Sequence, residues 1–569
     1  MKINCVLYLL HTINIIMHLF TRTFLLLCLF SILWSTNGAS QNIKYQPVKA
    51  PKRELRAAWV ATVLNIDYPK SPSTNPIALK EQYRNLLDQL QDVGMNAVIV
   101  QVRPAGDALY PSAYAPWSAY LTGRQGAAPL EDFDPLAFMI EETRSRAMEF
   151  HAWINPFRAS MNLDTASLYL THPVFQHPDW LVAYGGKMYF NPGIPAVRNH
   201  LVDVVGELVD NYDLDGIHID DYFYPYPVKD TPFPDSMTFK FYGQPYKDIK
   251  DWRRNNTDQL VQALHQRIKS VRPTVQLGVS PFGVWRNKSD EAPGGSATKA
   301  GATSYDDLYA DVLNWINKGW LDYVMPQIYW SIGYAPADHQ TLVQWWSQNS
   351  RDLPLYIGHA AYKVGDNAVV EWNDPGEIPK QIDLNRRNFR TLGSAFFSAK
   401  SISANPLRLK DSLRTYYQYP ALWQERPELE LPKLAASELL RPKWKNDAVR
   451  LRWRPGKGID GVRQQAHYYV IYRFNGQQLG DFEDPANILA ITPLAAGDQR
   501  KVEFYDNATA VGETYTYAIR TANRANVESN PGAARSILQK TNTRIKRPRT
   551  KKTKERKVRT KVRRRDLKQ

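Results

Sequence analysis

The chain has 569 residues, 43% of them hydrophobic, with 16 Trp and 32 Tyr. This is enough for a large core and for two or three domains. The formal net charge is +16, but residues 544–568 hold 15 Lys and Arg against two acids, which leaves +3 for the rest of the chain. This distribution excludes a globular body that binds nucleic acid through a basic surface, and we expect no nucleic-acid partner.

The N-terminus has the pattern of an export signal. Arg22 precedes an apolar run at 24–34, and small residues follow at 38–40. We therefore expect a signal peptide over 1–40 and a protein exported to the periplasm or cell envelope. The alternative is a membrane anchor that is retained at the N-terminus.

Residues 41–425 alternate short apolar runs with amphipathic helical patterns. Each run is continuously apolar, as expected for parallel strands buried on both faces. Eight such runs occur, at 57–62, 97–102, 149–154, 216–220, 276–280, 323–327, 355–358 and 394–398. Helical patterns lie between them, one ending at Gly94 and others at about 135–148, 196–211, 252–271, 305–318, 338–349 and 378–391.

This alternation predicts an α/β fold, a (β/α)8 TIM barrel. A doubly wound open sheet is the alternative fold. That fold places a Gly-rich phosphate-binding turn after the first strand, where this chain has Thr62-Val63-Leu64-Asn65.

The pattern changes beyond residue 425. Pro427 and Pro432 mark a linker, and strand-like runs follow without helices, at 449–453, 467–474, 502–506 and 515–522. These runs predict a small all-β sandwich over 428–540 whose pattern resembles a fibronectin type III domain. The Lys/Arg-rich tail at 541–569 is expected to be disordered. It either contacts anionic envelope polymers or lipid head groups or serves as a solvated, solubilising tail.

The most informative segment is 214–227, where a buried strand leads into Asp220 and Asp221 and then into a cluster of aromatic residues. Carboxylates stabilise the transition state of glycosidic bond cleavage, and aromatic faces hold sugar rings. The structural alternative is an aspartate pair that caps a loop. Because alternate strand residues share a face, Asp220 should lie with His218 on the interior side of the barrel. Asp221 reaches the site only if the chain bends there.

The partner carboxylate is less strongly indicated by the sequence. Asp107, in the loop after the second strand, is the leading candidate, ahead of Asp221 and Glu291. His218 is slightly favoured as a hydrogen-bonded interior residue over a catalytic one. Strand ends and their loops supply the other candidate substrate contacts: Trp59, Arg103, Asn155, Arg158, His218, Tyr222, Trp285, Gln327, Tyr329, Trp330 and His359.

No cofactor or metal is implied. The sequence contains no H-E-x-x-H and no calcium-loop spacing of acids. The two cysteines, Cys5 and Cys28, both lie in the expected signal peptide. A mature chain without cysteine has no disulfides and no cysteine-based metal site.

Five ordered motifs resemble the glycosyl-hydrolase-like family 10 domain: RELRAAWVAT (53–62), QVRPAGDALY (101–110), AWINPFR (152–158), DGIHIDDY (215–222) and PQIYW (326–330). The resemblance covers about 52–420. It implies a bacterial, exported TIM-barrel glycoside hydrolase, and some members are linked to peptidoglycan glycan strands stripped of peptide. It supplies no settled catalytic pair to carry over to this sequence.

Residues 215–222 are also similar to the fourth-strand signature of family 18 chitinases. In that signature a glutamate is the acid, and Tyr222 stands at that position here, while Asp220 matches a retained aspartate. The sequence thus predicts a glycoside hydrolase that acts on a polysaccharide, with peptide-free peptidoglycan glycan as the favoured substrate. The alternative is a non-catalytic carbohydrate-binding barrel of the cell envelope.

Overall fold

The computed structural model describes residues 48–538 except 433, 446, 457–465 and 495–501. The expected signal peptide and the Lys/Arg-rich tail lie outside the described residues. The strands and helices described below all lie within one compact unit, Ala50–Gln569. Over the described ranges, no helix combines the length and the apolarity that crossing a membrane requires.

Eight parallel strands form a closed barrel, which confirms the predicted fold class. Their order around the barrel is β1-β11-β10-β9-β8-β7-β3-β2. The strands are β1 (Leu55–Val60), β2 (Ala97–Arg103), β3 (Glu149–Ile154), β7 (Gly216–Ile219), β8 (Gln276–Val279), β9 (Tyr323–Val324), β10 (Leu355–His359) and β11 (Thr391–Phe396). Every one coincides with a predicted apolar run.

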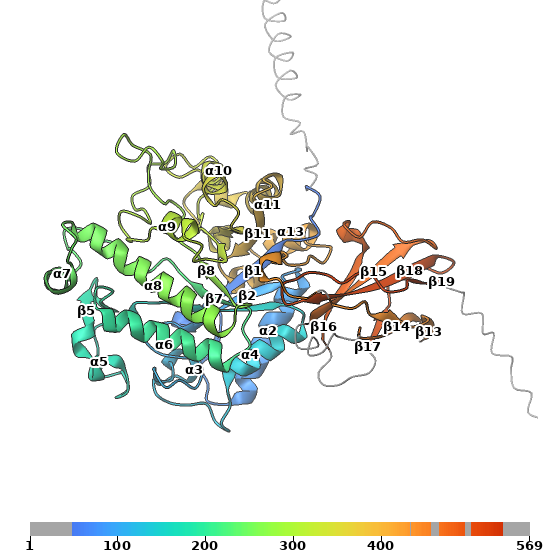
Figure 1. Cartoon of the computed structure of the whole chain (residues 1–569), viewed down its shortest axis with the longest axis horizontal. Coiled ribbons are helices and arrows are strands. Elements are labelled where there is room, and N and C mark those ends of the chain that lie inside the picture. Colours follow the sequence, from blue (N-terminus) through green and yellow to red (C-terminus); the bar gives the residue numbers. More distant parts are fainter. Residues whose placement is uncertain (1–47, 433, 446, 457–465, 495–501, 539–569) are drawn as a thin grey trace, which may run out of the picture. The chain divides into compact units, whose positions relative to one another are not determined.

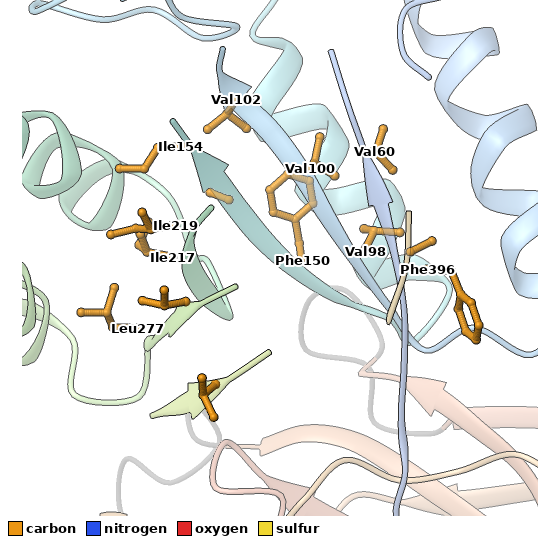
Figure 2. Close-up of a cluster of buried hydrophobic side chains, with 14 of the residues drawn as sticks. Val60, Val98, Val100, Val102, Phe150, Ile154, Ile217, Ile219, Leu277 and Phe396 are labelled. Carbon is orange, nitrogen blue, oxygen red and sulfur yellow. The ribbon is translucent and has the colours of Figure 1, made fainter. Parts of the chain in front are cut away.

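The side chains of each strand alternate between two environments. Val98, Val100 and Val102 of β2 belong to the large apolar cluster that also includes helix residues, whereas Ala97 and Ile99 belong to a second cluster with interior residues such as Trp59 and Tyr323. Figure 2 shows the helix-facing set on several strands. The interior position after Ile99 is Gln101, which is fully buried. Polar residues therefore enter the barrel interior toward its carboxyl end.

Helices cover the outside of the barrel (Figure 1). Side chains cap several of them: Asn75 accepts a hydrogen bond from Ile77 N and Asp134 accepts from Leu136 N. The covering helices are α2 (Pro76–Asp92), α4 (Pro135–Ser145), α6 (Pro195–Asn211), α8 (Ile249–Val271), α9 (Val312–Asn317), α10 (His339–Asn349), α11 (Glu377–Arg387), α12 (Ala399–Ala404) and α13 (Leu409–Tyr416). Short helices α3 (Ala119–Thr122), α5 (Pro173–Gln176) and α7 (Ser236–Tyr242) lie in connections.

The helix predicted at 305–318 is wrong in its first half, because α9 begins only at Val312. Tyr309 has a left-handed backbone with φ of 52°, which a helix cannot accommodate. Asp311 then caps the helix by accepting a hydrogen bond from Asn314 N.

A three-stranded antiparallel sheet that the sequence pattern did not predict is inserted between β3 and α6. It has the order β4-β6-β5 and consists of β4 (Arg158–Ser160), β5 (Leu181–Tyr184) and β6 (Lys187–Phe190). Gly185 and Gly186, both with positive φ, form the β5–β6 turn. This insertion brings two cations toward the carboxyl end of the barrel.

After the barrel the chain forms two four-stranded antiparallel sheets. One contains β12 (Glu438–Leu439), β13 (Lys443–Lys445), β14 (Ala448–Arg454) and β17 (Val502–Asp506), and the other contains β16 (Ile488–Pro493), β15 (Ala466–Asn475), β18 (Thr514–Asn523) and β19 (Arg535–Leu538). The two sheets share a buried apolar cluster that includes Trp453, Tyr469 and Tyr517. All four strands predicted for this region are present, and the fibronectin type III resemblance stays a prediction.

Candidate active site

A cavity of about 390 Å³ opens at the carboxyl end of the barrel. It is lined by Trp59, Val63, Ile66, Gln101, Trp153, Arg158, Met161, Lys187, Asp220, Asp221, Tyr222, Tyr226, Ser280, Gln327, Tyr329, Tyr362 and Phe397. A second cavity, of about 370 Å³, has one carboxylate, that of Asp92, and this group is paired with Arg414 and Lys410. Only the first cavity presents carboxylates without an ion-pair partner among the described residues.

Both Asp220 and Asp221 line this cavity because strand β7 ends at Ile219. Regular alternation therefore stops before the pair, and Asp221 is free to turn toward the same space as its neighbour. The sequence analysis required a bend at this position for Asp221 to reach the site, and the chain does bend there.

Asp220 is held by three N–H donors. Its Oδ2 accepts hydrogen bonds from Trp153 Nε1 at 3.0 Å and Asn155 Nδ2 at 2.9 Å, and its Oδ1 accepts from Tyr222 N at 3.2 Å. Burial raises the pKa of Asp220, while the nearby charge of Arg158 and these donors lower it in part. The side chain is thus fixed in position, with donors that favour its ionised form.

Asp221 has a different environment. Burial, and next the charge of Asp220, raise the pKa of Asp221 to about 6. The hydroxyl group of Tyr226 donates a short hydrogen bond to Asp221 Oδ2, and the Gln327 side chain also hydrogen-bonds to this carboxyl group. Gln327 is itself oriented by donation from Nε2 to Ser280 O at 2.8 Å. A carboxyl group with this pKa is suited to carry and release a proton near neutral pH.

Two cations flank the acids. The Arg158 guanidinium lies over the Tyr222 ring, 4.5 Å from its centroid, and its Nε is buried without a partner in the described structure. Lys187 on β6 is half-buried at the cavity wall, and no hydrogen bond or ion pair joins it to a side chain of the described ranges. Gln101 Nε2 is a further buried donor with no partner there. Of these groups, Lys187 is partly exposed at the cavity wall and is available to a polar or anionic ligand.

Aromatic rings form the rest of the wall. Tyr329 contacts both Tyr362 and Phe397, with ring centroids 6.1 and 6.3 Å apart, and Phe397 contacts Trp59 at 6.4 Å. Trp153 adds a further indole on the side of Asp220. Such a wall offers apolar faces to a sugar ring.

Beneath the cavity, His218 is fully buried in the barrel interior, where alternation predicts it. Its Nδ1 lies 2.9 Å from the Tyr323 hydroxyl group and its Nε2 lies 2.8 Å from Ser280 Oγ. The Trp59 indole donates to Nε2 at 3.4 Å. Burial lowers the pKa of His218 well below its usual value. His218 is therefore a neutral, hydrogen-bonded residue of the interior, the role that the sequence slightly favoured.

Asp107 does not line the cavity. It is buried in the loop after β2, where it accepts a hydrogen bond from Ala105 N at 2.9 Å and one from the Ser118 side chain. Burial raises its pKa to about 6, so its environment resembles that of Asp221 without the open space. Glu291, the other alternative, is exposed on a loop outside the cavity.

Several other predicted substrate contacts lie outside the cavity lining and form hydrogen bonds within the protein. Asn155 orients Asp220, and Arg103 donates to Asn155 O at 2.9 Å. His359 is buried between Gln381 and Ser394.

Two tryptophans among the predicted substrate contacts lie outside the cavity lining. Trp285 packs on Trp345, with centroids 5.8 Å apart, and Trp330 contacts Phe282 edge-on at 5.4 Å. The predicted contacts that do line the cavity are Trp59, Arg158, Tyr222, Gln327 and Tyr329.

The prediction missed several cavity residues. Trp153 shares a strand face with Asn155, so alternation along β3 could have identified it. Lys187 and Met161 come from the inserted segment, for which the barrel pattern holds no signal. Among the described residues, no group of three or more His, Cys, Asp or Glu side chains is placed to hold a metal ion.

Comparison with known proteins finds relatives of this chain by sequence. The chain is 45% identical over 484 residues to "Glycosyl hydrolase YngK" of Bacillus subtilis (strain 168), spanning 84% of this chain and 92% of the relative. It is 40% identical over 354 residues to "Glycosyl hydrolase DigH" of Escherichia coli (strain K12), spanning 58% and 80%. A solved structure of the PgaB (BpsB) glycoside hydrolase domain from Bordetella bronchiseptica is similar with a TM-score of 0.41 and 13% identity, over 64% of this chain and 99% of that one. The family described as glycosyl hydrolase-like 10 matches residues 54–374, and the chain belongs to this family.

Proposed function

We propose that this protein is an exported glycoside hydrolase that cleaves O-glycosidic bonds in the glycan strands of peptidoglycan from which the peptides have been removed. The observation that carries the proposal is the pair Asp220 and Asp221, two carboxyl groups with raised pKa values that share an open, aromatic-walled cavity. Glycosidic bond cleavage uses two such groups in different protonation states. Membership of the glycosyl hydrolase-like 10 family supports the general activity.

The two acids take different roles. Asp220 accepts hydrogen bonds from three N–H donors that favour its ionised form, and in that form it stabilises positive charge that develops on the sugar. Asp221, with a pKa of about 6, donates a proton to the departing glycosidic oxygen. Asp107 has a similar pKa but no access to the cavity, so Asp221 is the better proton donor.

The substrate assignment rests on the cavity's cations and on the expected location. Muramic acid residues of a peptide-free glycan carry a free carboxylate, and Lys187 offers an ammonium group at the cavity wall. The envelope to which residues 1–40 are proposed to direct the protein contains this polymer. The aromatic wall provides the stacking surface that a sugar chain requires.

The test uses purified peptidoglycan whose stem peptides have been removed enzymatically. The native protein should release soluble sugar products, and Asp220→Asn should release them far more slowly. Asp258→Asn is a matched control, because Asp258 also has a pKa raised to about 6 by burial but lies on α8 outside the cavity. Equal product release by native protein and Asp220→Asn would reject the assignment. Glycan binding without products would favour a non-catalytic carbohydrate-binding barrel.

The tail at 541–569 is proposed to hold the protein on anionic envelope polymers or lipid head groups. A truncation after Gln539 should weaken envelope association at low salt and leave it unchanged at high salt, because salt screens such contacts. If the full-length and truncated proteins associate equally with the envelope at low salt, the proposed role of the tail is contradicted.

A further inference from the structure

The acids of the cavity stand next to each other in the chain. Among the cavity residues, Asp220 and Asp221 supply both carboxyl groups, and consecutive Cα atoms are about 3.8 Å apart. The two side chains therefore enter the cavity from one place, the end of β7. Hydrolysis by two carboxyl groups alone places one at the leaving oxygen and the other at the opposite face of the anomeric carbon. Two adjacent carboxyl groups at the end of β7 are poorly placed to lie on opposite sides of the anomeric carbon.

No other described cavity side chain is a ready nucleophile. Burial raises the pKa of Tyr222 to about 12 and raises the pKa values of Tyr226, Tyr329 and Tyr362. The Ser280 hydroxyl group lies 2.8 Å from His218 Nε2, but burial lowers the pKa of His218 well below its usual value, so this imidazole is too weak a base to activate the serine. The attacking group must come from the substrate or from water.

The hydrogen bonds that hold Asp220 favour a role as a hydrogen-bond acceptor for the ligand over a role as the nucleophile. A carboxylate offers about four acceptor positions. Trp153 and the Tyr222 backbone N–H each donate to one oxygen of Asp220, and Asn155 Nδ2 lies 2.9 Å from Oδ2 and 3.2 Å from Oδ1. An attack by either oxygen would have to give up these bonds. A single N–H of the ligand can instead take the place of the longer Asn155 contact on Oδ1.

We propose that the nucleophile is the 2-acetamido group of the sugar that is cleaved, with Asp220 accepting a hydrogen bond from its N–H and Asp221 acting as acid and then base. This inference rests on the proposed function. It restricts the substrate to polymers whose reacting sugar is a 2-acetamido-2-deoxy sugar. The aromatic wall formed by Trp59, Trp153 and Phe397 provides apolar surface for the acetamido methyl group.

In the first step, Asp221 transfers its proton to the glycosidic oxygen as the bond from that oxygen to C1 breaks and its electron pair goes to the oxygen. The acetamido carbonyl oxygen forms a bond to C1, which closes an oxazolinium ring. The ionised Asp220 stabilises the positive charge through the N–H hydrogen bond. In the second step, the Asp221 carboxylate takes a proton from water, and the water oxygen bonds to C1. The ring C1–O bond breaks and its electron pair returns to the carbonyl. The configuration at C1 is retained and Asp221 is protonated again.

The experiment compares four preparations of one peptide-free glycan: native, de-N-acetylated, re-N-acetylated and N-trifluoroacetylated. De-N-acetylation should lower the rate by at least ~1000-fold, because an intramolecular nucleophile has a very high effective concentration. Re-acetylation should restore the rate. The trifluoroacetyl group keeps the shape and the N–H but is a weak nucleophile, so that glycan should remain slow. Its hydrolysis at the native rate would overturn the inference, since the group would then serve only as a binding contact.

Two further readouts complete the test. The first-formed product should show retained anomeric configuration by proton NMR, and inversion would overturn the inference. A thiazoline analogue of the oxazolinium ring should bind at least ~100-fold more tightly than the corresponding free sugar. Asp220→Asn should lose this preference while Asp258→Asn keeps it.

The outcomes separate the two proposals. Products released with inversion, or equally fast from native and trifluoroacetylated glycan, remove the acetamido mechanism and leave the glycosidase standing. Failure of the native protein to release products from any of the four glycans overturns both.

Discussion

Buried carboxylates at the two ends of the barrel have different partners. At the amino end, the Glu54 carboxylate lies 2.8 Å from Arg56 Nε and 2.8 Å from Arg386 Nε. At the carboxyl end, Asp220 and Asp221 form no ion pair with any described residue and accept hydrogen bonds mainly from neutral donors. Their exposed fractions are nearly the same, 4% for Glu54, 4% for Asp220 and 5% for Asp221. Burial alone therefore does not distinguish them.

The difference appears in their protonation. Burial raises the pKa of all three groups, but the charges of Arg56 and Arg386 outweigh it and hold the pKa of Glu54 below its usual range. The pKa values of Asp220 and Asp221 stay raised. The Glu54 carboxylate, paired with two cations, stays ionised and supports the fold, whereas Asp221, with a pKa of about 6, can exchange a proton near neutral pH.

The largest effect should come from removing the proton of Asp221. Asp221→Asn should lower hydrolysis of the natural glycan by about 10²–10⁴-fold, the usual contribution of a general acid. The loss should be much smaller for a 4-nitrophenyl glycoside of the same oligosaccharide, because nitrophenolate leaves without a proton. The ratio kcat/KM on both substrates gives the comparison, because it reports the breaking of the glycosidic bond and not the later attack of water, in which Asp221 acts as base. Equal losses on the two substrates would contradict the assigned role, and Asp107→Asn should show neither loss.

At the opposite end, Glu54→Gln should act on stability and leave catalysis unchanged. It leaves Arg56 and Arg386 without the carboxylate that neutralises them, which should cost about 3–5 kcal/mol of unfolding free energy. Urea unfolding measures this loss. The ratio kcat/KM of the folded enzyme should match the native value. If Glu54→Gln were as stable as the native protein, Glu54 would not be a structural acid, and the proposed difference between the two ends of the barrel would be contradicted.

The stability of Asp221→Asn should depend on pH in the direction set by a raised pKa. Between about pH 4 and 6 the folded protein keeps a proton on Asp221 that the unfolded chain has lost, so native stability falls as the pH rises through this window. Asparagine does not titrate, so the variant does not lose stability in this way. Relative to the native protein, its free energy of unfolding should increase between pH 4 and pH 7 by up to about 3 kcal/mol.

Thermal or urea unfolding at pH 4, 5, 6 and 7 checks this prediction. Asp67, Asp107 and Asp258 also have pKa values raised to about 6, but they titrate in both proteins and cancel in the difference. A difference that shrinks with rising pH would contradict the assigned shift.

The smallest effect should come from loosening Asp220. Trp153→Phe removes an N–H donor that lowers the pKa of Asp220, so this pKa should rise. A hydrogen bond to a charged group contributes about 1.5–3 kcal/mol, so the rate should fall by about 10–100-fold. The loss should be greater at pH 5 than at pH 7, because more of Asp220 is then protonated. Trp285→Phe, outside the cavity, is the control. If the acidic limb of the pH–rate profile is unchanged in Trp153→Phe, the role of Trp153 as a hydrogen-bond donor that lowers the pKa of Asp220 is contradicted.

The sequence predicted the barrel because parallel strands buried on both faces leave continuous apolar runs. All eight runs became strands, and alternation placed His218 in the interior. The same rule could not place Asp221, because alternation holds only within a strand and β7 stops at Ile219. Asp107 lies outside the cavity lining because its loop folds so that Asp107 accepts a hydrogen bond from the Ala105 amide, an arrangement that the sequence does not show.

The inserted sheet of β4, β5 and β6 was not predictable for a related reason. Its strands are only three or four residues long, and β4, with the sequence Arg-Ala-Ser, contains no apolar run. Its role in the cavity follows from tertiary packing alone.

This inserted sheet also separates two tasks that many enzymes combine. It occupies a single connection, between β3 and α6, and contributes no strand to the closed barrel. Its hairpin carries Lys187, whereas the acids stand at the end of β7. On the proposed function, a change in the length or sequence of this hairpin would alter which polymer enters the cavity, while Asp220, Asp221 and Arg158 of β4 stay in place.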